Sequence, residues 1–529
     1  MVPYAGAMTN QETARVGDGS PAAVAPIPDR PGPHGNGPAL AGTHAGLGLA
    51  VVMIGVLITA IDTTIVVLAL PEIERGLHVA LNSIIWVVIG YLLVITLLAT
   101  QVGRLGDMFG RVRMYEAGFV VFIVGSALCA LAWDQVSIVA FRVLQGVGGA
   151  LMTANSGAII ADLFPPEKRG RAYGFNAVGW SAGAVLGIVV GGAMVTYVSW
   201  RWIFWINVPI GALGVTMALR VLKDSTRRVR HRLDLAGMLA LGLGLYGILW
   251  AMTRLATSPF DATTTGFLIG GVVLVAIFVL LERARHEPML DLSLLRIPTV
   301  TPTLLAALLQ GLANFAVLFL VIMYLQGPRG MSPINASLLL VPGYVVGSIF
   351  GPGAGRLADR LGPVLPATAG LGTQVVALFV YSRLSATTGL WVVVLASVLN
   401  GIGASSFFPA NSAALMRAVK PHTFGIASGI LRTFANVGMV FSFSMAILVA
   451  SRSISRHLAF AIFVGTAKLH GNVARAFTVG LHSAFYASMA VMALAAALSA
   501  TRAARRLHPG TPPAGARAMA LNGQGAARP

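Results

Sequence analysis

The chain has 529 residues, of which 56% are apolar and only 10% charged, and its formal net charge is +19 at pH 7. Soluble domains carry roughly 25% charged residues, so this composition excludes a soluble enzyme and predicts an integral membrane protein. The positive charge is dispersed over many segments and forms no basic domain, which argues against a nucleic-acid-binding protein.

The chain is predicted to begin and end with tails. Residues 1–45 contain seven prolines, seven glycines and no apolar run long enough to cross a bilayer. They also lack the charged start and short apolar core of a signal peptide. We therefore expect a disordered tail at 1–45, and a second, basic tail at 502–529.

Fourteen apolar stretches follow the first tail, each close to the 20 or so residues that a helix needs to cross a bilayer core about 30 Å thick. They begin near Gly46, Ile84, Val112, Gln135, Arg171, Trp202, Leu233, Thr265, Thr303, Asn335, Gly362, Gly389, Phe424 and His482. They show no strand-like alternation, and lipid tolerates only helices and closed barrels. The sequence therefore predicts an all-α membrane protein with fourteen transmembrane helices.

A charged turn occurs twice, as GRLGDMFGRVR at 103–113 and as GRLADRLG at 355–362. Both copies share an opening glycine, an aspartate four residues later and a second glycine. The residues of the two turns that we single out are Gly103, Asp107, Gly110, Arg111 and Arg113, and Gly355, Asp359 and Arg360. A repeat of this kind predicts a transporter built from two similar halves.

The spacing of the turns locates an insertion. The turns lie 252 residues apart, whereas the first six helices, Gly46 to Leu222, occupy only 177 residues. The surplus of about 75 residues matches the segment 223–300. We expect a six-helix bundle at 46–222, inserted helices seven and eight with their linkers at 223–300, and a second six-helix bundle at 301–501.

Lysine and arginine set the expected orientation. Nineteen of them lie in the loops after even-numbered helices and nine in the opposite loops. The positive-inside rule then places the even loops and both tails in the cytoplasm. We expect a multi-pass protein of the cell (inner, cytoplasmic) membrane.

Two charges lie deep inside predicted helices. Asp62 is eight residues from the outer end of helix one and Arg142 seven residues from that of helix four, so both are roughly 10 to 12 Å deep. Charges at such depth are expensive and mark functional sites. One interpretation is proton coupling, in which protonation of Asp62 breaks the pair; the other is a static ion pair that fixes helix register.

Other polar residues in the helices are candidates for lining a central cavity: Gln145, Asn314, Arg432 and Asn436. Arg432 lies eight residues from a cytoplasmic helix end, so snorkelling to the interface explains it nearly as well as substrate contact. Helix five carries glycines at Gly174, Gly183, Gly187, Gly191 and Gly192. Small residues spaced by four let helices approach closely, and a smooth glycine face would also let helix five slide or bend.

No catalytic cluster emerges from the sequence. GWSAG at 179–183 and GLGLYG at 242–247 fit enzyme motifs but lie inside predicted spans, and the chain contains no Gly-Lys dipeptide, which excludes a P-loop. Cys129 is the sole cysteine, so no intramolecular disulfide forms. We expect no enzyme activity, no metal and no cofactor other than protons as the coupling ion.

The residues of both turns resemble the cytoplasmic signature of the major facilitator superfamily. TAIDTTIVVLALP in helix one, RVLQG from Arg142, the helix-five glycines and WRWIFWINVPIG at 200–211 resemble its fourteen-helix drug:proton antiporters. The resemblance implies two six-helix bundles that rock around a central cavity, with helices seven and eight outside that core. It departs at Ile188, where the antiporter signature has proline, and at the second turn, which lacks the basic pair of the first.

Together these patterns predict proton-coupled export of amphipathic or hydrophobic small molecules by a monomer. We expect Asp107 to cap the following helix, to meet basic partners on the other bundle and, with Arg111, to latch the inward face. One alternative is an exporter of lipids or cell-envelope intermediates, suggested by the segment 451–481 with its apolar run 458–464. A receptor or intramembrane enzyme is a weaker alternative.

Overall fold

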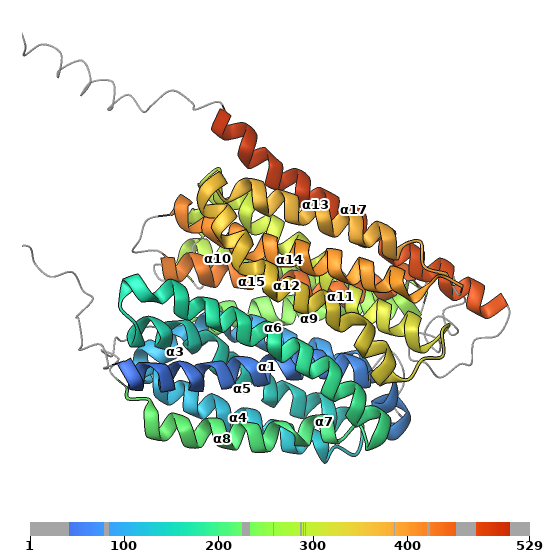
Figure 1. Cartoon of the computed structure of the whole chain (residues 1–529), viewed down its shortest axis with the longest axis horizontal. Helices are drawn as coiled ribbons and strands as arrows, with labels where there is room; N and C mark the ends of the chain where they lie inside the picture. Colours follow the sequence, from blue (N-terminus) through green and yellow to red (C-terminus); the bar gives the residue numbers. More distant parts are fainter. Residues whose placement is uncertain are drawn as a thin grey trace, which may run out of the picture. The chain divides into compact units, whose positions relative to one another are not determined.

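The computed structural model describes residues 42–78, 84–224, 233–257, 259–285, 288, 290, 292–385, 387–419, 424–450 and 472–507 (Figure 1). Every regular element among them is helical. Thirteen helices are long and apolar enough to cross a membrane, and α3 supplies a fourteenth span when its two parts, which bend by 56° around Thr100, are counted together. The predicted fourteen-helix membrane class is thereby confirmed. The predictions for most of the two tails and for residues 451–471 lie outside the described residues.

The N-terminal half contains α1 (Gly42–Leu77), α3 (Trp86–Phe109), α4 (Arg111–Ala130), α5 (Gln135–Leu163), α6 (Pro166–Tyr197), α7 (Trp202–Trp205) and α8 (Asn207–Val221). The short α7 and α8 together form the sixth span. α1 packs against α6, and α5 packs against α3 and α4. Aromatic side chains fill the centre: Tyr115 and Phe119 are fully buried and meet edge to face at 5.1 Å.

The C-terminal half contains α11 (Val300–Gln326), α12 (Pro333–Leu361), α13 (Val364–Tyr381), α14 (Leu390–Ala418), α15 (Phe424–Ala450) and α17 (Asn472–Leu507). Here α14 packs against α12 and α13, and α15 packs against α11. α17 runs past residue 502, where we predicted the basic tail to begin. Arg502 is buried and donates to Thr303 Oγ1 (3.0 Å) and Asn411 Oδ1 (2.8 Å), so it belongs to the bundle.

Two helices and a short turn connect the halves: α9 (Leu235–Thr257), α10 (Ala262–Ala284) and the 3-10 helix η1 (Leu292–Arg296). α9 packs against α10 and also against α3 and α15, which belong to different halves. The backbones of α9 and α10 approach closely at Gly244 and Gly271. Most of α10 exposes apolar side chains such as Val272 and Leu280, as expected of a lipid-facing helix.

The halves touch through α6 with α12 and through α3 with α15. At the end of α6 far from the 103–113 turn, Gly192 lies against the first turn of α12, where a Cβ on Gly192 would collide with Ser337 and with the backbone of Ile334 and Pro333. The two halves are therefore in direct backbone contact at this end.

The repeat is also present in the backbone. Gly110 separates α3 from α4 with φ of 111°, and Gly362 separates α12 from α13 with φ of 81°. L-residues with side chains rarely adopt these angles, so glycine is required at both turns.

Candidate functional site

A buried ion pair lies at the centre of the N-terminal half. Arg142 Nη1 of α5 is 2.7 Å from Asp62 Oδ2 of α1, and the two side chains are 1% and 0% exposed. The structure therefore brings together the two charges that the sequence places at matching depth. Both lie within one bundle and are sealed from solvent in this conformation.

Three neutral side chains complete the network around the pair. Gln145 accepts from Arg142 Nη1 (2.7 Å) and donates to Asp62 Oδ1 (2.9 Å). Asn207 donates to the same Asp62 oxygen (3.3 Å) and to Ser126 Oγ (3.0 Å). Asp62 thus accepts from three side chains on two helices other than its own.

The guanidinium of Arg142 is also enclosed. Its Nε donates to the carbonyl of Val87 at 2.9 Å, and its Cζ lies 4.1 Å from the ring centre of Tyr91 and 5.8 Å from that of Phe204. Desolvated cation–π contacts of this kind stabilise a buried arginine. Replacing either side chain by an apolar one would leave the other charge buried without a partner, which is strongly destabilising.

The local sequence explains why the hydrogen-bond donors to Asp62 come from other helices. The hydroxyls of Thr59, Thr63 and Thr64 donate to carbonyls three or four residues earlier in α1. These threonines have acceptors within their own helix, and Thr64 also reaches the carbonyl of Ala184 on α6 (3.4 Å). The carboxylate of Asp62 accepts, and the donors available to it are on α5 and α8.

The predicted glycine face of α6 packs on α1 next to Asp62. A Cβ on Gly187 would strike the carbonyl of Ile61, and one on Gly183 or Gly191 would collide with Ala60 or Ile65. Gly192 faces α12, whereas the surroundings of Gly174 lie outside the described residues. Three glycines therefore lie close against α1, and Gly192 makes the contact with the other half.

The predicted helix cap in the first charged turn is not made by Asp107. Asp107 lies inside α3 and pairs with Arg111 (2.9 Å), which also pairs with Asp162 at the end of α5 (2.9 Å). Asp107 was predicted to cap α4, but the residue before that helix is Gly110 and no side chain caps it. Asp224 instead lies against Gly110. A carboxylate at this position interacts favourably with the positive end of the α4 dipole. The ion pairs shown for Asp107 stay within its own half.

The remaining turn residues are less enclosed. Arg113 and Arg360 are exposed. A Cβ at Gly103 or Gly355 would meet no atom within 4 Å, so packing does not require glycine there in this conformation. The side chain of Asp359 lies outside the described residues.

Comparison with known proteins agrees with this architecture. The sequence profile of the Major Facilitator Superfamily matches residues 52–443 and again residues 303–521. The chain belongs to the Major Facilitator Superfamily. It is therefore a multi-pass membrane transporter and not an enzyme.

Similar transporters include drug exporters. The chain is 30% identical to the tetracenomycin C resistance and export protein of Streptomyces glaucescens, over 76% of each chain. It is 28% identical to multidrug resistance protein 3 of Bacillus subtilis, over 73% of this chain and 76% of that one. The inward-facing, unoccupied structure of a bacterial homolog of the human lysosomal transporter Spinster covers 86% of this chain and 96% of its own, with a TM-score of 0.61 and 17% identity, which shows the fold alone.

The other cavity candidates of the transporter are scattered. Gln145 is fully buried in the network of Asp62. Asn314 is half-buried on α11, while on α15 Arg432 is exposed and Asn436 half-buried. The structure thus assigns Gln145 to the buried pair and places the other three in the C-terminal half.

Several residues of the network were missed by sequence reasoning. Asn207 lies in the WRWIFWINVPIG stretch, where an asparagine among apolar residues was a usable signal. Ser126 and Tyr91 carried no such signal, because small hydroxyls and aromatic residues are common in membrane helices. Also missed was a neutral cluster in the C-terminal half, in which Gln310 donates to Gln374 (3.4 Å) and Gln374 to Asn400 (3.3 Å).

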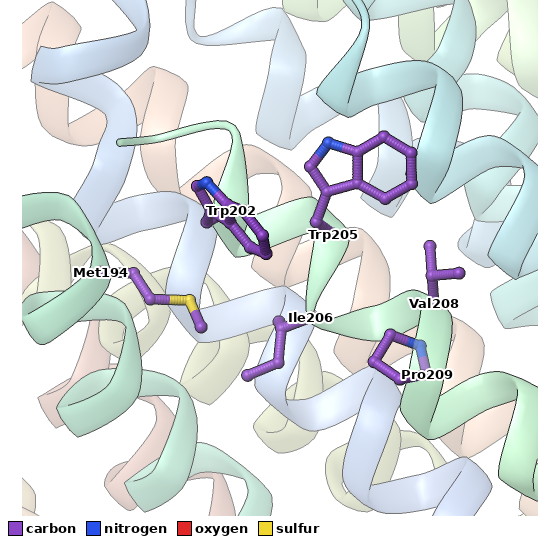
Figure 2. A pocket seen from close by; sticks show the side chains of 6 residues that line it. All are labelled: Met194, Trp202, Trp205, Ile206, Val208 and Pro209. Carbon is purple, nitrogen blue, oxygen red and sulfur yellow. The ribbon is translucent and has the colours of Figure 1, made fainter. Parts of the chain in front are cut away.

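An apolar pocket of about 460 Å³ lies beside the α7–α8 junction. Figure 2 shows its lining side chains, which come from the end of α6 and from the α7–α8 segment: Met194, Trp202, Trp205, Ile206, Val208 and Pro209. Asn207, between two of these residues, is buried and reaches Asp62. One short segment therefore contributes both to the pocket wall and to the ion-pair network. Within the described residues no cluster of His, Cys, Asp or Glu is placed to hold a metal ion.

Proposed function

We propose that the transporter exports amphipathic or hydrophobic small molecules in exchange for protons, by alternating access. The observation that carries the proposal is the Asp62–Arg142 pair, a buried carboxylate whose charge is balanced by one arginine. Relatives named as drug resistance and export proteins support the substrate class and the direction.

Protonation of Asp62 is the coupling step in this proposal. A neutral carboxyl no longer attracts the guanidinium of Arg142, so the packing of α1 on α5 weakens. An inward proton moving through about 100 mV supplies roughly 2.3 kcal/mol. This energy drives export only if the proton and the cargo prefer different conformations, since a ligand shifts an equilibrium by its differential affinity.

Helix α6 is suited to transmit this change between the halves. Gly187 rests on Ile61, next to Asp62, and Gly192 rests on the first turn of α12. If α1 shifts on protonation, it therefore displaces α6, the same helix that contacts α12 of the other half. We assign the Asp107–Arg111 pair, near the opposite end of the N-terminal half, the role of joining the other half when the cytoplasmic side is closed.

The proposal includes the setting of the protein. We place it in the cytoplasmic membrane with both termini in the cytoplasm, because the arginine-rich loops lie on that side. It acts as a monomer on a small substrate and protons, without a cofactor or nucleic acid. Export of lipids or envelope intermediates is the second candidate, but the apolar run 458–464 that favours it lies outside the described residues.

Transport in proteoliposomes tests the proposal. Asp62→Asn should abolish dye efflux driven by a pH gradient while leaving exchange of the dye between the two sides in place. Glu72→Gln is the matched control, because Glu72 lies ten residues further along α1 in a half-exposed pair with Arg75 and should leave efflux intact. Gradient-driven efflux at the wild-type rate in Asp62→Asn would overturn the assignment.

A further inference from the structure

A pair of buried acids lies where the inserted helices join α3. Asp234, directly before α9, is 1% exposed, and Glu282, in the last turn of α10, is 3% exposed. Their carboxyl groups are within hydrogen-bonding reach of each other. Yet Asp234 Oδ2 and Glu282 Oε1 are buried without a donor among the described residues. Two ionised carboxylates cannot bond to each other, because neither has a hydrogen to donate.

The other oxygens of the two acids are well satisfied. Asp234 Oδ1 accepts from the backbone of Gly237 (2.6 Å) and pairs with Arg285 Nη1 (2.6 Å). Glu282 Oε2 accepts from the backbone of Leu290 (2.9 Å). One oxygen of each acid is therefore left unsatisfied, and a hydrogen shared between these two oxygens would satisfy both.

We propose that Asp234 and Glu282 form a proton-binding site that holds a single shared proton at the junction of α9, α10 and α3. The proton resides on Glu282 Oε1 and is donated to Asp234 Oδ2. We assign the proton to Glu282 because Arg285 and the positive end of α9 lie beside Asp234, whereas Glu282 lies near the negative end of α10. No metal is needed, since two acids offer too few ligands and Arg285 already supplies the positive charge.

The surrounding groups connect this site to the first charged turn. Among the described residues, the charged groups facing Glu282 are Asp234 and Arg104 of α3, and Arg104 also donates to the carbonyl of Pro288 (2.6 Å). Arg285 is paired with Asp234. Gln101, one turn earlier in α3, is 4% exposed; its Oε1 accepts from the Asp234 backbone (3.5 Å), while its Nε2 is buried without an acceptor among the described residues. On α15, which also packs on α9, the ionisable residue is the exposed Arg432. The proton therefore joins the start of α9 to the end of α10, beside Gln101 and Arg104 of α3.

Infrared spectroscopy of the purified full-length protein in lipid tests the site. The carbonyl band of a protonated carboxylic acid should be present near neutral pH and absent in Glu282→Gln. Asp234→Asn should lose the same band, because the new amide donates to Glu282 and removes the need for the proton. The double variant Asp234→Asn/Glu282→Gln should lose no more band intensity than either single variant. Asp62→Asn, which tests the proposed transport mechanism, should leave this band unchanged.

Thermal unfolding gives a second readout. The folded protein holds a proton that the unfolded chain releases, so the melting temperature of the wild type should fall as pH rises and the two carboxylates begin to repel. Glu282→Gln should fold normally and lack this pH dependence, because glutamine donates to Asp234 and accepts from Leu290 as the protonated acid does. A band that survives in Glu282→Gln, or a Glu282→Gln protein that does not fold, would overturn the proposal.

Discussion

The cores of the two halves contain different polar networks at related positions. In the N-terminal half Asp62 and Arg142 form a charged pair at 2.7 Å. Asn314 lies 252 residues after Asp62, the same spacing that separates the two charged turns. The corresponding half therefore has an amide where the first has an acid, and its buried network of Gln310, Gln374 and Asn400 is neutral, with bonds of 3.3 and 3.4 Å.

This difference indicates that the two halves of the duplicated fold have different roles, one in pH-independent stability and one in the response to protons. A neutral amide network contributes stability that does not depend on pH, because amides do not titrate. A buried acid paired with arginine makes packing depend on protonation. If the transporter responds to protons through its bundle cores, the response belongs to the N-terminal half, and the C-terminal half is left to follow it or to bind cargo.

The largest effect on stability is expected when Arg142, the cation of the charged pair, is replaced. Arg142→Leu should destabilise the protein by about 3 to 5 kcal/mol, because Asp62 is then left buried without its partner. Thermal unfolding in detergent would measure the loss, with Gln310→Leu in the other half as the matched variant. Equal losses in the two variants would mean that the charged network is no more costly to break than the neutral one.

Much of the fold follows from local properties of the sequence. The length and hydropathy of a span decide that it crosses the bilayer, and the repeated turn reveals the two halves. The pairing of Asp62 with Arg142 could be predicted because the depth of each residue follows from its distance in sequence from the helix end and the rise of about 1.5 Å per residue. These features need no knowledge of how helices pack.

Other features depend on packing and were out of reach. Asp107 was expected to cap α4, but α3 continues to Phe109 and leaves the aspartate inside the helix. Arg502 looked like the start of a tail because its acceptors, Thr303 and Asn411, come from distant helices. Asn207 reaches Asp62 because it is the first residue of α8, and the junction of α7 and α8 places it next to α1.

A second test concerns how tightly α1 and α6 pack in the charged half. Gly187→Ala should cost about 2 to 3 kcal/mol and slow transport, since its Cβ would press on the α1 backbone beside Asp62. Gly372→Ala on α13 is the matched control, because that glycine has no atom within 4 Å of a built Cβ. Alanine there should be neutral or stabilise by up to about 1 kcal/mol. Unfolding and efflux rates of the two variants would be compared, and equal behaviour would refute a special role for this contact.

The neutral network should be less costly to break. Gln374→Leu should destabilise by about 1 to 2 kcal/mol, because Gln310 and Asn400 each lose a buried hydrogen-bond partner. The pH dependence of efflux should keep its wild-type shape, since no titratable group is touched. Thr373→Ala, an exposed change on the same helix, serves as the control for stability. A changed pH profile in Gln374→Leu would place proton sensitivity in the C-terminal half and break the comparison.

The smallest expected effect comes from giving the second half an acid. Asn314 is half-buried, and its Oδ1 is buried without a donor among the described residues. In Asn314→Asp the new carboxyl would stay neutral at low pH and become unfavourable as it ionises, because burial penalises the charged form. The folded state would then hold a proton that the unfolded chain releases, so stability should fall by about 1 kcal/mol as pH rises. Melting curves across pH would measure this, with Asn314→Gln as the neutral control. If Asn314→Asp instead gained stability on ionisation, a cation would have to lie close to this position, and the C-terminal half would hold the elements of a charge pair like that of the first.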